Sequence, residues 1–182
     1  MQSNKSLIFH LFLLLAGLVW IGLSADPNGS TTAGKIPAPQ AGFLAPDFTL
    51  NSLDGKRYTL SELRGQAIIL NLWASWCPPC RAEMPTLQKL YEEYRNQGLL
   101  VLAVNSTVQD KPAAIPGFVQ QYGLTFPILL DEDGEVSRAY QLRSLPSSYF
   151  IGRDGIIREV VIGGPMSEAL LRTRIEIILN TP

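Results

Sequence analysis

The stretch that most constrains the fold is QAIILNLWASWCPPCRAEMP, residues 66–85, in which an almost unbroken apolar run leads directly to two cysteines. A run without polar alternation is typical of a strand that is buried on both faces of a sheet. Residues 79–96 carry apolar side chains at helical spacing, and LLVLAVN, residues 99–105, forms a second apolar run. The order strand, helix, strand predicts two parallel strands joined through a helix.

Shorter patterns before and after this unit complete an α/β domain. DFTL and RYTL flank the turn SLDG and predict a β-hairpin, while SSYFI and IIREVVI flank GRDG and predict an antiparallel pair. The other expected elements are a helix over 115–122, a strand at FPILL, a short helix at EVSRAYQL and a closing helix over 167–179. The predicted architecture is a central mixed sheet flanked by helices, with an N-terminal β-hairpin extension.

The N-terminal residues have a different character. Lys5 precedes an apolar run from Leu7 to Leu23 that only His10 interrupts, which is typical of a targeting segment. We expect residues 1–25 to be a membrane signal-anchor or a cleaved signal peptide, and in either case the remainder lies outside the cytoplasm. Residues 26–42 are rich in Gly, Pro, Ser and Thr and are expected to be a flexible linker, followed by one domain over 43–182.

Composition excludes several classes of function. The formal net charge of −1 and the scattered basic residues do not favour a nucleic-acid partner. Cys77 and Cys80 are the only cysteines and His10 is the only histidine, so the domain lacks the ligands of a structural zinc site and the residues of a Cys-His or Ser-His-Asp centre. Arg81 follows Cys80 where a haem attachment motif needs histidine. We expect no metal and no cofactor.

The two cysteines are placed where a thiol becomes reactive. They follow the carboxyl end of a predicted central strand and open the next helix, whose unpaired N–H groups and dipole stabilise a thiolate. Cys77 is expected at the exposed tip as the nucleophile, and Cys80, one turn deeper, is expected to resolve the mixed disulfide. Trp76 flanks Cys77 and is a candidate for the docking surface.

From Phe43 to Leu179 the chain resembles thioredoxin-fold oxidoreductases of the TlpA, ResA and CcmG type. The resemblance is carried by LNLWASWCPPCRAEMP, VLAVN, YGLTFPILLD, SLPSSYFI and GRDG. It implies thiol-disulfide exchange, with Pro146 in the cis form facing the disulfide and the backbone at Leu145 pairing with the substrate. It further implies a monomeric reductant that is supplied by a membrane electron donor and acts on cysteine-containing proteins such as apocytochrome c.

The group that accepts the proton of Cys80 is less well defined. Asn71 stands where cytoplasmic thioredoxins bury an aspartate, and the resemblance to ResA implies a glutamate after VLAVN that this chain lacks. Asp110 is the nearest acid and is either the proton acceptor or an ordinary loop residue. Glu83 is expected to be a solvated helix residue.

Two other functions stay open. A peroxiredoxin-like peroxidase has a related fold, but its T-x-x-C pattern needs threonine where this chain has Ala74. A redox-inert binding module would use the same surface without exchanging disulfides. A purely structural disulfide is disfavoured, because it would close so small a loop that it would add little stability.

Overall fold

The structure is a computed structural model that describes residues 3–24 and 36–181. The chain divides into two compact units, Met1–Thr32 and Ala33–Pro182. The first unit contains helix α1 (Ser3–Ser24). Within the described ranges, no helix combines the length and the hydropathy needed to cross a membrane. Residues 25–35, which include residues 26–35 of the predicted linker, lie outside the described residues.

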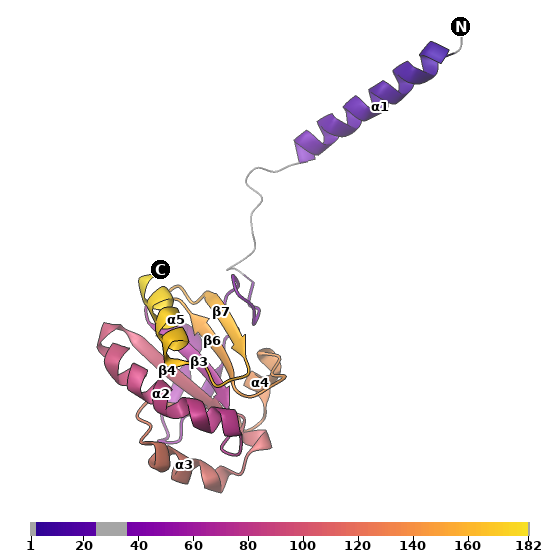
Figure 1. Ribbon diagram of the computed structural model, residues 1–182. Helices are drawn as coiled ribbons and strands as arrows, with labels where there is room; N and C mark the ends of the chain where they lie inside the picture. Colours follow the sequence, from indigo (N-terminus) through magenta and orange to yellow (C-terminus); the bar gives the residue numbers. More distant parts are fainter. Residues whose placement is uncertain (1–2, 25–35, 182) are drawn as a thin grey trace. The chain divides into compact units, whose positions relative to one another are not determined.

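A five-stranded mixed sheet forms the centre of the second unit (Figure 1). Its strands, in spatial order, are β5 (Ile128–Leu130), β4 (Leu99–Asn105), β3 (Ala67–Trp73), β6 (Ser147–Ile151) and β7 (Ile157–Ile162). Strands β3, β4 and β5 run parallel, whereas β6 is antiparallel to both β3 and β7. The predicted mixed sheet and both of its pairing directions are confirmed.

Helices cover the sheet, and short 3-10 segments connect the elements. The α-helices are α2 (Pro78–Tyr94), α3 (Ile115–Tyr122), α4 (Glu135–Ala139) and α5 (Glu168–Asn180). The 3-10 segments are Leu60–Leu63, Arg95–Gln97, Thr107–Gln109 and Pro112–Ala114. Figure 1 shows α2 and α5 lying on the same face of the sheet.

Strand β3 explains why the central run is apolar throughout. Every residue of β3 is buried, and successive side chains point to opposite faces. Ile69 and Trp73 pack in the cluster that includes residues of α2 and α5, whereas Leu70 and Leu72 pack in the cluster on the other face, with Tyr149. Both faces are therefore core, and β3 is fixed in register at the centre of the sheet.

The predicted N-terminal hairpin is present. Strands β1 (Thr49–Asn51) and β2 (Arg57–Thr59) pair antiparallel, and Leu53 N–H donates to the carbonyl of Ile128 in β5 at 2.8 Å. The hairpin thus lies against the β5 edge of the sheet.

The folded unit also includes residues that precede the predicted boundary at residue 43. Ala38 N–H donates to Leu44 O at 3.0 Å, and Gly42 N–H donates to Ile157 O at the start of β7 at 2.8 Å. Residues 38–42 therefore make backbone contacts with this unit, although the sequence pattern assigns them to the linker.

Candidate redox site

Both cysteines lie where β3 passes into α2. Cys77 is the N-cap residue of α2, and its Sγ accepts a hydrogen bond from Cys80 N–H at 3.3 Å. Pro78 and Pro79 occupy the first two helical positions, where the missing N–H of proline leaves no hydrogen bond unmade. Cys77 and Cys80 are joined in a disulfide with a Cα–Cα distance of 5.3 Å. The first helical turn therefore holds the two sulfurs together at the positive end of the helix dipole.

The expectation that Cys77 is exposed is wrong for this disulfide-bonded state. Cys77 is 2% exposed and Cys80 is 1% exposed, so both are buried. The two cysteines still differ in access, since Cys77 borders a surface groove and Cys80 is not among the lining residues. Of the two cysteines, Cys77 is the one accessible from this groove.

The groove beside Cys77 has a volume of about 340 Å³. Its other lining residues are Trp76, Pro78, Pro79, Gln109, Leu142, Arg143, Ser144 and Leu145. Most of this lining is apolar, and Arg143 is the only charged residue in it. The groove suits an extended peptide segment with apolar side chains next to a cysteine.

Three residues predicted to bind substrate lie at or beside this groove. Trp76 is 56% exposed, and its indole N–H donates to Gln109 O at 2.8 Å, which fixes the ring at the rim. Leu145 lines the groove and is half-buried. Pro146 is buried, its peptide bond with Leu145 is cis, and its carbonyl accepts from Gly163 N–H at 2.8 Å.

The carboxylate of Asp110 accepts four hydrogen bonds. Its carboxylate accepts from Ser75 N–H and Oγ, both at 2.6 Å, from Asn105 Nδ2 at 2.8 Å and from Lys111 N–H at 2.7 Å. Burial would raise the pKa of Asp110, but the hydrogen bonds from Asn105 and Ser75 outweigh it and lower the pKa below 3.8. A carboxylate held ionised by four donors is a weak base, so its contacts favour holding the segment before Cys77 in place over accepting a proton.

Glu83 is the site residue that sequence reasoning missed. It is 2% exposed, and the expectation of a solvated residue is wrong. Its Oε1 accepts from Asn71 Nδ2 at 3.1 Å, and its Oε2 accepts from Met166 N–H at 2.9 Å. Asn71 also donates to Ser148 Oγ at 2.9 Å. Burial raises the pKa of Glu83, and the hydrogen bonds from Met166 and Asn71 oppose this shift only in part.

The helical pattern contained the signal for Glu83. Residues three and four apart share a helix face, and Cys80, Glu83, Met84 and Leu87 follow that spacing. All four are buried in the structure. An acid on the same buried stripe as a redox cysteine, one turn further along, is a candidate for proton transfer.

The segment Gly163–Met166, which follows β7, packs against Pro146 and Glu83. A Cβ atom added at Gly164 would lie 2.8 Å from Pro146 Cγ and 3.1 Å from Glu83 Oε2. Pro146 and Glu83 therefore both lie close to Gly164, where there is no room for a side chain.

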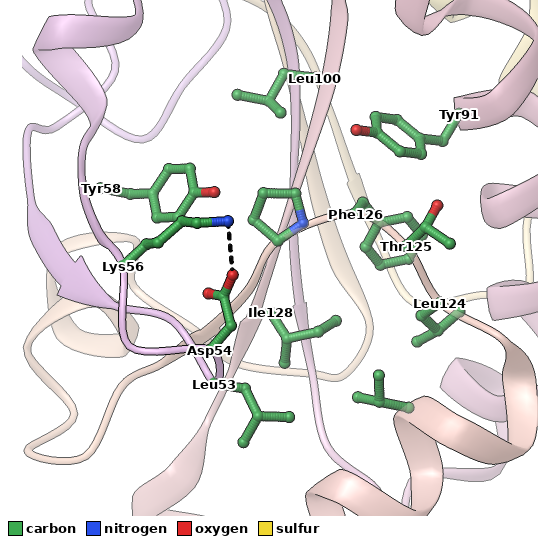
Figure 2. A pocket seen from close by; sticks show the side chains of 12 residues that line it. Leu53, Asp54, Lys56, Tyr58, Tyr91, Leu100, Leu124, Thr125, Phe126 and Ile128 are labelled. Atoms are coloured by element: carbon green, nitrogen blue, oxygen red, sulfur yellow. Dashed lines mark ion pairs between the residues drawn. The ribbon is translucent and has the colours of Figure 1, made fainter.

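A second and larger cavity, of about 440 Å³, lies at the hairpin edge. Figure 2 shows Tyr58 and the Asp54–Lys56 ion pair on one side of it and Tyr91 and Phe126 on the other. No cysteine lines this cavity, and the ion pair is largely exposed. The redox chemistry belongs to the smaller groove.

Comparisons with known proteins agree with this geometry. Residues 41–160 match the AhpC/TSA family. The thiol-disulfide oxidoreductase ResA of Geobacillus kaustophilus is 35% identical over 172 residues, which are 94% of this chain and 96% of the relative. ResA of Bacillus subtilis is 33% identical over 178 residues, covering 98% of this chain and 96% of that protein.

Solved structures give the same picture. A putative thiol:disulfide interchange protein DsbE from Chlorobium tepidum has a TM-score of 0.71 and 30% identity, and the match covers 79% of this chain and all (100%) of that one. A secreted disulfide oxidoreductase of Mycobacterium tuberculosis has a TM-score of 0.65 and 27% identity, covering 71% of this chain and 95% of that one.

Proposed function

The chain belongs to the AhpC/TSA family and is a thiol-disulfide oxidoreductase within it, and we propose that it reduces disulfide bonds of other proteins outside the cytoplasm. This agrees with the predicted resemblance to the TlpA, ResA and CcmG type. One observation carries the proposal: the cysteine pair closes over the first turn of α2, and only Cys77 faces a groove.

The proposed reaction has two steps. In the reduced protein, the Cys77 thiolate attacks one sulfur of the substrate disulfide, which forms a mixed disulfide and releases the other substrate sulfur as a thiolate that takes up a proton. The Cys80 thiolate then attacks Cys77 Sγ, which breaks the mixed disulfide, releases the second substrate thiol and leaves Cys77 and Cys80 oxidised. Two electrons pass to the substrate, and a dithiol donor has to return them.

Glu83 is our candidate for the proton acceptor of Cys80, in place of Asp110. Glu83 follows Cys80 by one helical turn on the same buried face, and burial raises its pKa, which makes it a better proton acceptor than a solvated carboxylate. Asp110 is assigned to positioning, because its hydrogen bonds hold the backbone and side chain of Ser75, two residues before Cys77.

The N-terminal segment bears on where in the cell the protein acts. We infer that residues 1–25 direct the chain out of the cytoplasm, as signal-anchor or cleaved signal, because Lys5 precedes a long apolar run. One structural neighbour is named as secreted and another, from Streptococcus pneumoniae, as an exposed lipoprotein thioredoxin. A membrane donor of thiol-disulfide type and a substrate such as apocytochrome c complete the proposal.

Insulin reduction with dithiothreitol tests the activity. We expect insulin precipitation to be accelerated by the wild type and not by Cys77→Ser. Consumption of peroxide without insulin reduction would favour the peroxidase, and neither reaction would favour a binding module. A reduction potential near thioredoxin's roughly −270 mV supports a reductant, whereas a value near −120 mV, as for DsbA, contradicts it.

A further inference from the structure

The groove carries one positive charge, on Arg143, that no acidic side chain of the described residues pairs with. Arg143 is exposed and lines the groove together with its neighbours Leu142 and Ser144 and with the residues at the start of α2. Within residues 36–181, none of the hydrogen bonds or ion pairs involves its guanidinium. Arginine presents five N–H donors in a planar fork that matches a carboxylate, and an exposed fork without a partner is free to bind one.

The two carboxylates of the redox site are held by partners other than Arg143. Asp110 is saturated by donors from Ser75, Asn105 and Lys111. Glu83 is buried under the Gly163–Met166 segment and binds Asn71. The groove therefore presents one positive group to solvent beside an otherwise neutral lining.

We propose that this groove selects disulfide substrates that carry an acidic residue close to the reacting cysteine. The proposal rests on the proposed function and specifies its substrate class: an extended, mainly apolar peptide segment with one carboxylate that pairs with Arg143. The apolar lining from Trp76, Leu142 and Leu145 receives the flanking side chains.

The spacing follows from the chain geometry. Arg143 precedes Pro146 by three residues, and because residues 144–146 form a bend, about 10 Å is the upper limit of the distance that this segment spans. A substrate segment lying along residues 143–146, with its disulfide at Cys77, brings its second or third residue from the cysteine to Arg143. These contacts do not fix the direction in which the substrate chain runs. The acidic residue can therefore either precede or follow the cysteine in the substrate sequence, and peptides of both kinds are compared.

The test uses disulfide-linked peptide dimers of one sequence that differ only in Glu, Gln or Lys at the third residue before or after a single cysteine. The reduced full-length protein is mixed with each dimer at low ionic strength, and the second-order rate constant of peptide release is divided by the rate with dithiothreitol. This division removes the effect of the neighbouring charge on the peptide thiol itself.

We expect the Glu peptide of one set to react about two- to fivefold faster than its Gln counterpart, and the Lys peptide to react more slowly. Arg143→Glu should reverse this order, and 0.5 M salt should compress it, because exposed charges are screened. Arg95→Gln removes an exposed arginine outside the groove lining and should leave the order unchanged.

Equal Glu-to-Lys rate ratios in the wild type and in Arg143→Glu would overturn the selectivity while leaving the oxidoreductase function intact. Failure of the wild type to reduce any peptide, together with failure to reduce insulin, would overturn the proposed function itself.

Discussion

Replacing Asp110 by Ala should loosen the segment that carries Cys77. Four donors lose their acceptor in this variant: Ser75 N–H, Ser75 Oγ, Asn105 Nδ2 and Lys111 N–H. The loop after β4 would still be held by the bonds from Ser106 N–H to Trp73 O and from Trp76 Nε1 to Gln109 O, and Ser75 would keep the bond from Arg81 to its carbonyl.

The magnitude depends on which donors water can reach. Hydrogen bonds to a charged group contribute about 1.5–3 kcal/mol each, which would suggest a loss of about 6–12 kcal/mol for four. Asp110 and Lys111 are partly or fully exposed, so water replaces part of that loss. Asn105 is 0% exposed, and its orphaned amide should cost about 1–3 kcal/mol by itself. We therefore expect a destabilisation of about 2–3 kcal/mol.

Urea unfolding of the oxidised protein measures this value. The effect should depend on pH, because the pKa of Asp110 is lowered in the fold: its stabilising contribution is present above its ordinary pKa of 3.8 and is lost as the pH falls through the folded value. The difference between Asp110→Ala and the wild type should shrink accordingly in acid. Asp133→Ala is the control, since that exposed carboxylate accepts one backbone bond at 3.2 Å. An Asp110→Ala variant as stable as the control at pH 7 would refute the positioning role.

Three further substitutions test the other side of the site. Glu83→Gln should slow resolution of the mixed disulfide by about 10²-fold or more, and unchanged stopped-flow rates would exclude Glu83 as the proton acceptor. Because the pKa of Glu83 is raised in the fold, the wild type should lose stability as the pH rises from 4.5 through the folded pKa, and Glu83→Gln should remove this loss. Gly164→Ala should destabilise the protein by about 1–3 kcal/mol by crowding Pro146 and Glu83, whereas Gly117→Ala, with open space around it, should not; equal thermal midpoints for the two would contradict the close packing. Pro146→Ala should lower the rate of insulin reduction by a larger factor than its unfolding equilibrium changes, and an unchanged rate would count against the groove as the docking surface.

The fold was predictable because burial dominates its central elements. The continuous apolar runs of β3 and β4 occur where both faces of the sheet are covered, and their order around α2 fixed the parallel pairing. The linker boundary was less predictable, since residues 38–42 are polar or small and are held by backbone hydrogen bonds, which any sequence can make.

The site was only partly predictable, because some of its residues are brought together from positions far apart in the sequence. The cysteine pair, Trp76 and the helix start are adjacent in sequence, so local rules placed them together. Asp110 was singled out for its charge, but its use depends on Ser75, 35 positions earlier. Glu83 has partners at Asn71 and Met166, and the latter is 83 positions away, so only the tertiary fold reveals that this acid is buried.

Trapping of mixed disulfides tests most directly whether Cys77 attacks and Cys80 resolves. A Cys80→Ser variant keeps the thiol that borders the groove and lacks the one that releases the product, so covalent adducts with substrate proteins should accumulate on non-reducing gels. Cys77→Ser retains only the thiol behind the groove lining and should trap little. Equal trapping by the two variants, or trapping by Cys77→Ser alone, would contradict the assigned roles.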